Sequence, residues 1–185
     1  MNFLDSPSNN LLIADEVGLG KTIEAGVVLR QYVLDHPSDH SALVVVPDTL
    51  VSQWKGELRS RFSLGRLLGK SVKVVSFTQV KALSSNLSTA SIGLLIVDEA
   101  HHLTVTLRGG EVQPSPLYSR VRELSQCATR LLLLSATPVH SNEAGFLGLL
   151  HLLDPTVYRL DAVEEDSKGT NKIGTTQPKN TQIFP

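Results

Sequence analysis

Short apolar runs alternate with amphipathic stretches along most of this chain. Five runs have the length and composition of β-strands, at residues 11–14, 42–46, 72–77, 92–97 and 130–134. All but the third are nearly continuous in apolar residues, which is typical of strands covered on both faces. The pattern therefore predicts a sheet buried in the middle of the domain.

The stretches between these runs carry apolar residues at helical spacing. The positions fall into three sets: Leu50, Trp54, Leu58 and Phe62; Leu117, Val121 and Leu124; and Phe146, Leu149, Leu150 and Leu153. The rings of Trp54 and Phe62 are therefore predicted to lie in the core. Alternating strands and helices favour an α/β fold, with a parallel sheet and helices on both faces.

Two regions outside these elements differ in composition. Residues 109–116 contain two glycines and two prolines and predict a loop after the fourth strand. Residues 161–185 are mostly polar, with Thr, Asn, Gln and Lys prominent, and predict a mobile, disordered tail. We therefore expect one domain over residues 1–160, followed by that tail.

Composition and net charge bear on the partners and the compartment that we expect for this protein. The 185 residues carry a net charge of −1, so no overall attraction to nucleic acid or membrane follows. The single cysteine, Cys127, excludes an internal disulfide and suits a reducing compartment, where we expect it to be a buried small residue. No signal peptide and no apolar run of about 18 residues is present. We expect a cytoplasmic protein with no membrane partner.

The first segment that can carry chemistry follows the first predicted strand. It reads Ala14-Asp15-Glu16-Val17-Gly18-Leu19-Gly20-Lys21-Thr22. A loop with two glycines can wrap its backbone N–H groups around phosphates, while the lysine adds a charge and the threonine hydroxyl can ligate Mg²⁺. The strict phosphate-loop pattern has glycine where this chain has Asp15. Taken alone, the segment could also be an ordinary turn that opens a helix.

The second such segment, Asp98-Glu99-Ala100-His101, follows the fourth predicted strand. One carboxylate can hold a metal ion, and the other can orient an attacking water. Ligands of parallel sheets bind at the carboxyl ends of the strands, where both segments fall. Together the two segments predict a nucleoside triphosphate site.

With these segments in view, the chain resembles the first RecA-like half of a superfamily 2 helicase or translocase. The most similar branch is chromatin-remodeller-like (Snf2-type) and includes bacterial RNA-polymerase-associated translocases. Asp15 is usual in that branch. Four motifs carry the resemblance in the expected order: residues 14–25; Val44-Val45-Val46-Pro47 with Gln53, Trp54 and Glu57; Asp98-Glu99-Ala100-His101; and Leu134-Ser135-Ala136-Thr137-Pro138 with Asn142.

The resemblance implies a RecA-like P-loop NTPase that uses ATP and Mg²⁺. Lys21 would contact the β- and γ-phosphates, and Thr22 and Asp98 would hold Mg²⁺. Glu99 would orient or activate the hydrolytic water. Backbone N–H groups for the phosphates would come from Gly18, Leu19 and Gly20.

The resemblance also implies residues that couple the nucleotide to movement, namely His101, Ser135 and Thr137. Each of these has an alternative. His101 and His102 could be a metal pair, although we expect adjacent side chains on an extended or irregular segment to point apart. Ser135 and Thr137 could form only a strand-end turn. His140 stands where the family often has glutamine, which leaves that position's role open.

A basic stretch follows the second motif. Six basic residues and one acid, Glu57, occupy positions 55–73: Lys55, Arg59, Arg61, Arg66, Lys70 and Lys73. They could form a solvated helix face, or a surface that contacts the phosphates of nucleic acid without reading bases. The family places a strand-contacting motif near here, which favours contact through Lys55, Arg59 and Arg61.

Two parts of the family's motor are not found in these residues. They are the upstream segment that contacts adenine and the second RecA-like domain, which supplies an arginine finger. We therefore expect the ATP-binding half of a DNA translocase, with double-stranded DNA, the second RecA-like domain and other proteins as partners. Alone it should hydrolyse ATP weakly. The alternative is a truncated, non-catalytic fragment that binds nucleotide or nucleic acid.

Overall fold

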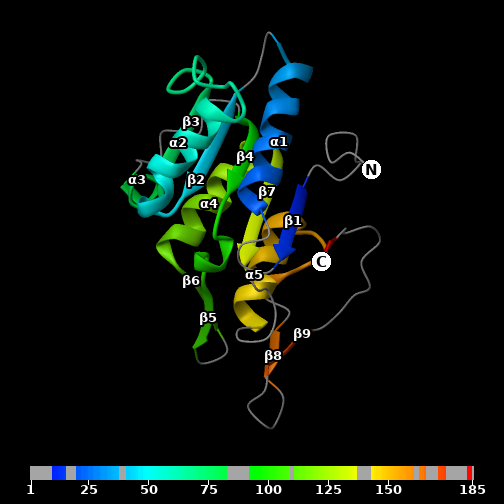
Figure 1. Cartoon of the computed structure of the whole chain (residues 1–185). Coiled ribbons are helices and arrows are strands. Elements are labelled where there is room, and N and C mark those ends of the chain that lie inside the picture. The colour runs from blue at the N-terminus through cyan, green and yellow to red at the C-terminus, as the bar shows by residue number, and fades with distance from the viewer. Residues whose placement is uncertain are drawn as a thin grey trace.

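The structure is a computed structural model of the 185-residue chain (Figure 1). It describes residues 10–15, 20–37, 41–82, 92–108, 111–136, 143–160, 163–165, 171–173 and 183–184.

A parallel sheet runs through the middle of the domain, as the apolar runs predict. Its order is β10-β1-β7-β4-β2-β3, and every described pairing in it is parallel. The strands are β1 (Asn10–Asp15), β2 (Ala42–Val46), β3 (Val72–Ser76), β4 (Ile92–Val97), β7 (Ala128–Ala136) and β10 (Ile183–Phe184). The five predicted strands are thus confirmed. β3, the least apolar of them, lies at a sheet edge.

Helices connect the strands. They are α1 (Lys21–Asp35), α2 (Val51–Ser60), α3 (Phe77–Ala82), α4 (Pro116–Gln126) and α5 (Glu143–Leu153). α2, α4 and α5 lie at the three predicted helical stretches, whereas α1 and α3 were not predicted and Phe77 begins α3 instead of ending the third strand. Two 3₁₀ turns, η2 (Asp48–Leu50) and η4 (Ala100–His102), follow β2 and β4. Among the described residues, no helix is both long enough and apolar enough to cross a bilayer.

The sheet separates two apolar layers. One layer contains Ala25 and Leu29 of α1 and Trp54 and Leu58 of α2. The other contains side chains of α3, α4 and α5, such as Tyr118. Along each central strand successive residues alternate between the layers, as the pleat of a strand requires. The expected helices on both faces are therefore confirmed.

The strand register brings three carboxyl ends together. β7 lies between β1 and β4, with Ala14 opposite Ser135 and Leu133 opposite Val97. The carboxyl ends of β1 and β4 therefore lie at one edge of the sheet, with the end of β7 between them.

The loop prediction for residues 109–116 was wrong in part. Glu111–Pro114 forms β6, which pairs antiparallel with β5 (Val105–Arg108) in a ribbon that projects from the domain (Figure 1). Pro116 is the first residue of α4, where its missing N–H costs nothing.

The polar segment 161–185 contains three short described strands. β8 (Val163–Glu165) pairs antiparallel with β9 (Asn171–Ile173), and β10 pairs parallel with β1. The disordered tail stays a prediction for the other residues of this segment, which lie outside the described ones.

Candidate nucleotide site

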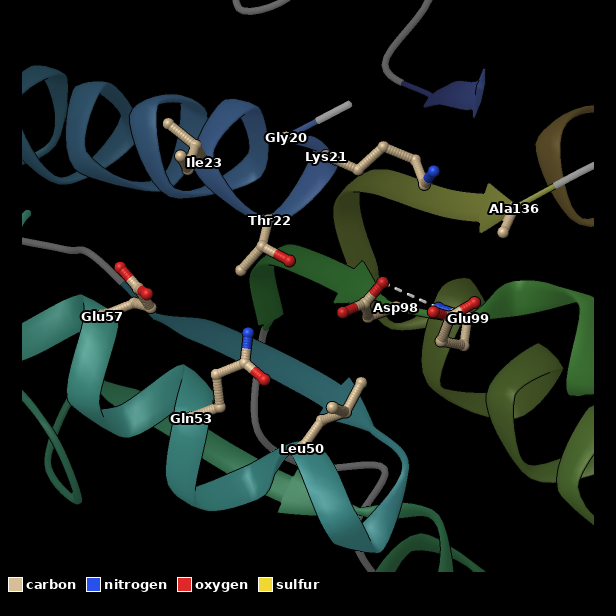
Figure 2. A pocket seen from close by; sticks show the side chains of 10 residues that line it. All are labelled: Gly20, Lys21, Thr22, Ile23, Leu50, Gln53, Glu57, Asp98, Glu99 and Ala136. Carbon is tan, nitrogen blue, oxygen red and sulfur yellow. Dashed lines mark hydrogen bonds between the residues drawn. The ribbon is translucent and has the colours of Figure 1, made fainter. Parts of the chain in front are cut away.

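A cleft of about 300 Å³ opens at the carboxyl edge of the sheet. Its walls are the first turn of α1, the start of α2, the end of β7 and the residues after β4 (Figure 2). The first and third sequence motifs therefore meet in one cavity, as predicted. The second motif lines the cavity too, through Gln53 and Glu57.

Gly20, the N-cap of α1, has a conformation that suits glycine. Its φ of 96° and ψ of 16° lie in the left-handed region, and its carbonyl oxygen accepts the N–H groups of Ile23 and Glu24 at 2.7 and 3.0 Å. The first N–H groups of a helix have no partner inside the helix, and its dipole favours an anion there. The start of α1 can therefore receive a phosphate.

Two side chains extend from this first turn into the cleft. The Lys21 side chain runs toward Ala136 at the end of β7, and the Thr22 hydroxyl points toward Asp98 (Figure 2). Both residues therefore line the cleft, and their contacts with phosphate and metal stay predictions. Gly18 and Leu19 lie outside the described residues, so their part in phosphate binding stays a prediction.

Asp98 is the buried carboxylate of the site, with 4% of its surface exposed. Its Oδ1 accepts the backbone N–H of Glu99 at 2.8 Å, and its Oδ2 accepts the indole N–H of Trp54 at 2.7 Å. Its own backbone N–H continues the sheet by donating to Val45. Each carboxylate oxygen has a second lone pair available to a further partner.

Glu99 has an unusual backbone for a residue with a side chain, with φ 50° and ψ 45°. Such strain is typical of functional sites and costs about 1–3 kcal/mol. The turn lets Glu99 line the cleft beside Asp98 (Figure 2). The sequence offers no signal for this left-handed residue.

His101 lies beside that glutamate, with Nδ1 3.2 Å from Oε2 of Glu99. Burial lowers the pKa of His101 below its usual 6.5; the neighbouring His102 acts in the same direction, and the carboxylates of Glu99 and Asp98 oppose it. The two histidine rings are 4.4 Å apart at 34°. The expectation that they point apart was wrong, because η4 curls the chain.

The fourth motif ends β7. Ser135 is fully buried, and its Oγ has no hydrogen-bond partner among the described residues. Thr137, Pro138, His140 and Asn142 lie outside the described residues, so the predicted coupling role of Thr137 rests on the resemblance alone.

The basic residues of α2 do not share one environment. Arg61 pairs with Glu57 at 2.5 Å, one helical turn away, so its charge is directed to the wall of the cleft. Arg59 is exposed and Lys55 is half-buried. Contact of Lys55, Arg59 and Arg61 with nucleic acid stays a prediction.

The donor set of the cleft fits Mg²⁺. Thr22 and Asp98 offer a hydroxyl and a carboxylate, the oxygen ligands that Mg²⁺ prefers. Within the described parts of the chain, no group of three or more His, Cys, Asp or Glu could hold a metal ion by itself. Mg²⁺ is commonly bound by one or two protein oxygens together with substrate phosphates.

Comparison with known proteins finds a matching family and similar relatives. The family described as "Type III restriction enzyme, res subunit" matches residues 1–140. RNA polymerase-associated protein RapA of Histophilus somni is 36% identical over 184 residues, covering 85% of this chain and 18% of the relative. RapA of Pectobacterium atrosepticum is 37% identical over 169 residues, covering 78% and 17%. The chain thus spans about a fifth of the length of these relatives.

Two solved structures share the fold. The Sulfolobus solfataricus SWI2/SNF2 ATPase core in complex with dsDNA has a TM-score of 0.64 at 19% identity, covering 85% of this chain and 34% of that one. The Pyrococcus furiosus Hef helicase domain has a TM-score of 0.60 at 20% identity, covering 82% and 35%.

Proposed function

Because the chain belongs to the family of the type III restriction enzyme res subunit, as an Snf2-type N-terminal RecA-like domain of superfamily 2, we propose that it binds Mg²⁺–ATP. In this proposal the cleft between α1, α2 and β4 holds the triphosphate. Hydrolysis drives movement along double-stranded DNA when a second RecA-like domain closes over the cleft.

The observation that carries the proposal is the meeting of Lys21, Thr22 and Asp98 in one cavity. The Lys21 ammonium attracts the β- and γ-phosphates, and the Gly18, Leu19 and Gly20 backbone cradles them. Thr22 and Asp98 hold Mg²⁺. The ion, when bound, neutralises charge that develops on the phosphate oxygens.

Glu99 takes the role of orienting the attacking water. Its side chain is partly exposed in the cleft, 29%, and so can reach solvent, whereas Asp98 beside it is buried and held by two donors. The two adjacent carboxylates thus differ in environment, which suits one to the metal and the other to water.

Coupling to movement is assigned to His101, Ser135 and Thr137. His101 lies against Glu99, so a shift of η4 moves the water-orienting carboxylate. The buried Ser135 hydroxyl, at the end of the strand beside β1, can take a partner when the nucleotide draws the neighbouring residues together.

The nucleic-acid partner is proposed from two observations. Arg59 and Lys55 lie on α2, and phosphate contacts require charge rather than base-specific groups. One solved structure of the same fold, the Sulfolobus solfataricus SWI2/SNF2 ATPase core, is a complex with dsDNA, and the RapA relatives are named for association with RNA polymerase. We extend both kinds of partner to this chain.

The test is the affinity for Mg²⁺–ATP, measured by calorimetry on the chain and on Lys21→Ala. We expect the variant to lose affinity at least tenfold, because the lysine charge faces the phosphates. Lys81→Ala on α3, exposed and outside the cleft, is the matched control and should bind as the unaltered chain does. Unchanged affinity in a folded Lys21→Ala would refute the site.

Turnover is tested with the second RecA-like domain joined to the chain, with and without double-stranded DNA. An arginine finger contributes about 10³–10⁵ in rate in related phosphoryl-transfer proteins, so hydrolysis should rise by orders of magnitude and respond to DNA. Binding without any hydrolysis in the joined protein would favour the alternative, a non-catalytic nucleotide-binding module.

A further inference from the structure

We propose that Trp54 is a positioning residue for the metal ligand Asp98. Its indole N–H holds the carboxylate in the orientation that the nucleotide-bound metal requires. The inference rests on the proposed function and assigns to α2 a part in the metal site. The sequence predicts only that the Trp54 ring fills the core.

Each oxygen of the Asp98 carboxylate accepts one hydrogen bond from the protein. Trp54 is 1% exposed, and its Nε1 lies 2.7 Å from Oδ2 of Asp98. The backbone N–H of Glu99 holds the other oxygen at 2.8 Å. With one donor on each oxygen the carboxylate plane cannot rotate freely, so the remaining lone pairs have fixed directions. Removing the indole donor leaves one oxygen of a buried carboxylate without this restraint.

Packing alone does not explain a tryptophan here. A buried indole N–H must find an acceptor, whereas a phenyl ring in the same layer needs none. Asp98 is the one buried carboxylate among the residues that the structure describes, and the indole donates to it across 44 positions of sequence. Hydrogen bonds that orient a ligating carboxylate usually affect metal affinity strongly.

The same helix also lines the cleft. Gln53 and Glu57, on either side of Trp54 in sequence, contribute to the cavity wall (Figure 2). A displacement of α2 therefore changes the cavity wall and the restraint on Asp98 together. This arrangement makes Trp54 the link between α2 and the metal ligand.

The test compares Trp54→Phe with the unaltered chain. Nucleotide binding is followed by calorimetry while free Mg²⁺ is varied. We expect the half-saturating Mg²⁺ concentration to rise about tenfold, because loss of such an outer hydrogen bond commonly costs 10–100-fold in metal affinity. Binding of ATP with the metal chelated should stay within about twofold, since the phosphate contacts of α1 do not involve Trp54. A purely structural role would weaken both.

Tyr118→Phe is the matched control. It also removes one buried aromatic hydrogen bond, from Tyr118 Oη to Gly148 O at 3.1 Å, but in the opposite layer of the core. Its Mg²⁺ dependence should equal that of the unaltered chain. An unchanged Mg²⁺ requirement in folded Trp54→Phe, with normal binding by the unaltered chain, would refute the positioning role alone. No nucleotide affinity in the unaltered chain at any Mg²⁺ concentration would refute the proposed function itself.

A second measurement needs no variant. Trp54 is the only tryptophan in the sequence, so tryptophan emission reports on the surroundings of this indole alone, its hydrogen bond to Asp98 included. Adding Mg²⁺ to the chain already saturated with ATP should shift that emission, because the acceptor carboxylate then shares its charge with the ion. An emission spectrum that does not respond to Mg²⁺, although calorimetry shows that the metal binds, would contradict the proposal.

Discussion

Gly26 sets the spacing between α1 and the end of α2, and this spacing offers a sharp test of the packing. The glycine lies in the interior of α1, and a Cβ built on it would fall inside 3.0 Å of three Phe62 ring atoms, with Cδ2 at 2.9 Å. Phe62 is 6% exposed, and its carbonyl oxygen accepts a hydrogen bond from Arg30 Nη1. The ring is thus buried against Gly26, and the backbone that carries it is bonded to the same helix.

Gly56 provides the matched comparison. It lies in the interior of α2, exposed, with no atom within 4 Å of a built Cβ. Alanine is favoured over glycine inside a helix by about 0.8–1.0 kcal/mol, so Gly56→Ala should raise the free energy of unfolding by about 1 kcal/mol. For a chain of this size that corresponds to about 2–4 °C in Tm.

Gly26→Ala has the same gain in helix propensity but must displace the Phe62 ring. Overpacking of a core costs about 1–3 kcal/mol, so this variant should be less stable than Gly56→Ala by that amount and less stable than the unaltered chain by up to about 2 kcal/mol. Urea unfolding followed by circular dichroism measures both. In a Phe62→Leu background the clash is relieved, and Gly26→Ala should then stabilise.

Two outcomes would refute this reasoning. If Gly26→Ala stabilises the chain as much as Gly56→Ala does, the ring does not confine the helix. If the effect of Gly26→Ala is the same with and without the Phe62→Leu change, the cost does not arise from the ring, because coupled neighbours must show a non-additive cycle.

Two further predictions concern the cleft. Glu99→Gln should keep Mg²⁺–ATP affinity within a few-fold and lower turnover of the two-domain protein by about 10² or more, since a positioned acid–base group acts mainly in the transition state; undiminished hydrolysis would assign the role to another group. Burial lowers the pKa of His101, so the folded chain favours the neutral imidazole. The stability that neutral His101 contributes is therefore full above pH 6.5 and is lost as the pH falls through the lowered pKa. Urea unfolding at pH 7.5 and 5.5 should therefore show a smaller acid destabilisation for His101→Gln than for the unaltered chain, and equal losses would contradict this.

The sheet was predictable because its strands are buried on both faces. A run such as Leu94-Leu95-Ile96-Val97 packs against apolar side chains in both layers. Its sequence is therefore continuously apolar, without the alternation of polar residues that is typical of a strand at the surface. Strand order was not predictable from the pattern. β7, the fifth described strand of the main sheet in chain order, inserts between β1 and β4.

The β5–β6 ribbon was missed although the sequence contains a signal for it. Two short segments, Val105–Arg108 and Glu111–Pro114, flank the pair Gly109-Gly110. Two glycines between short strands are a hairpin pattern. The two prolines that follow favoured a loop, but Pro114 ends a strand and Pro116 begins a helix, both positions that proline tolerates.

Within the site, the sequence predicted which residues meet but not how they are held. Motif spacing was sufficient for Lys21, Thr22, Asp98 and Glu99, because each follows or opens a predictable element. The hydrogen bond between Trp54 and Asp98 was not predictable, because the sequence indicates a core position for Trp54 and a metal-binding role for Asp98. The left-handed backbone of Glu99 is set by the turn that η4 imposes, which no local preference of glutamate favours.

The position of β7 gives a physical basis for assigning coupling to the fourth motif. The strand that ends in Ser135 and Ala136 pairs with β1, which leads to the phosphate segment, and with β4, which leads to Asp98 and Glu99. A nucleotide that draws the ends of β1 and β4 together must therefore act on the end of β7. Ser135 is buried there with a hydroxyl that has no partner among the described residues, so its proposed coupling role depends on a partner that the nucleotide would bring to it. A buried hydroxyl without a partner costs free energy, and satisfying it in one nucleotide state alone would favour that state.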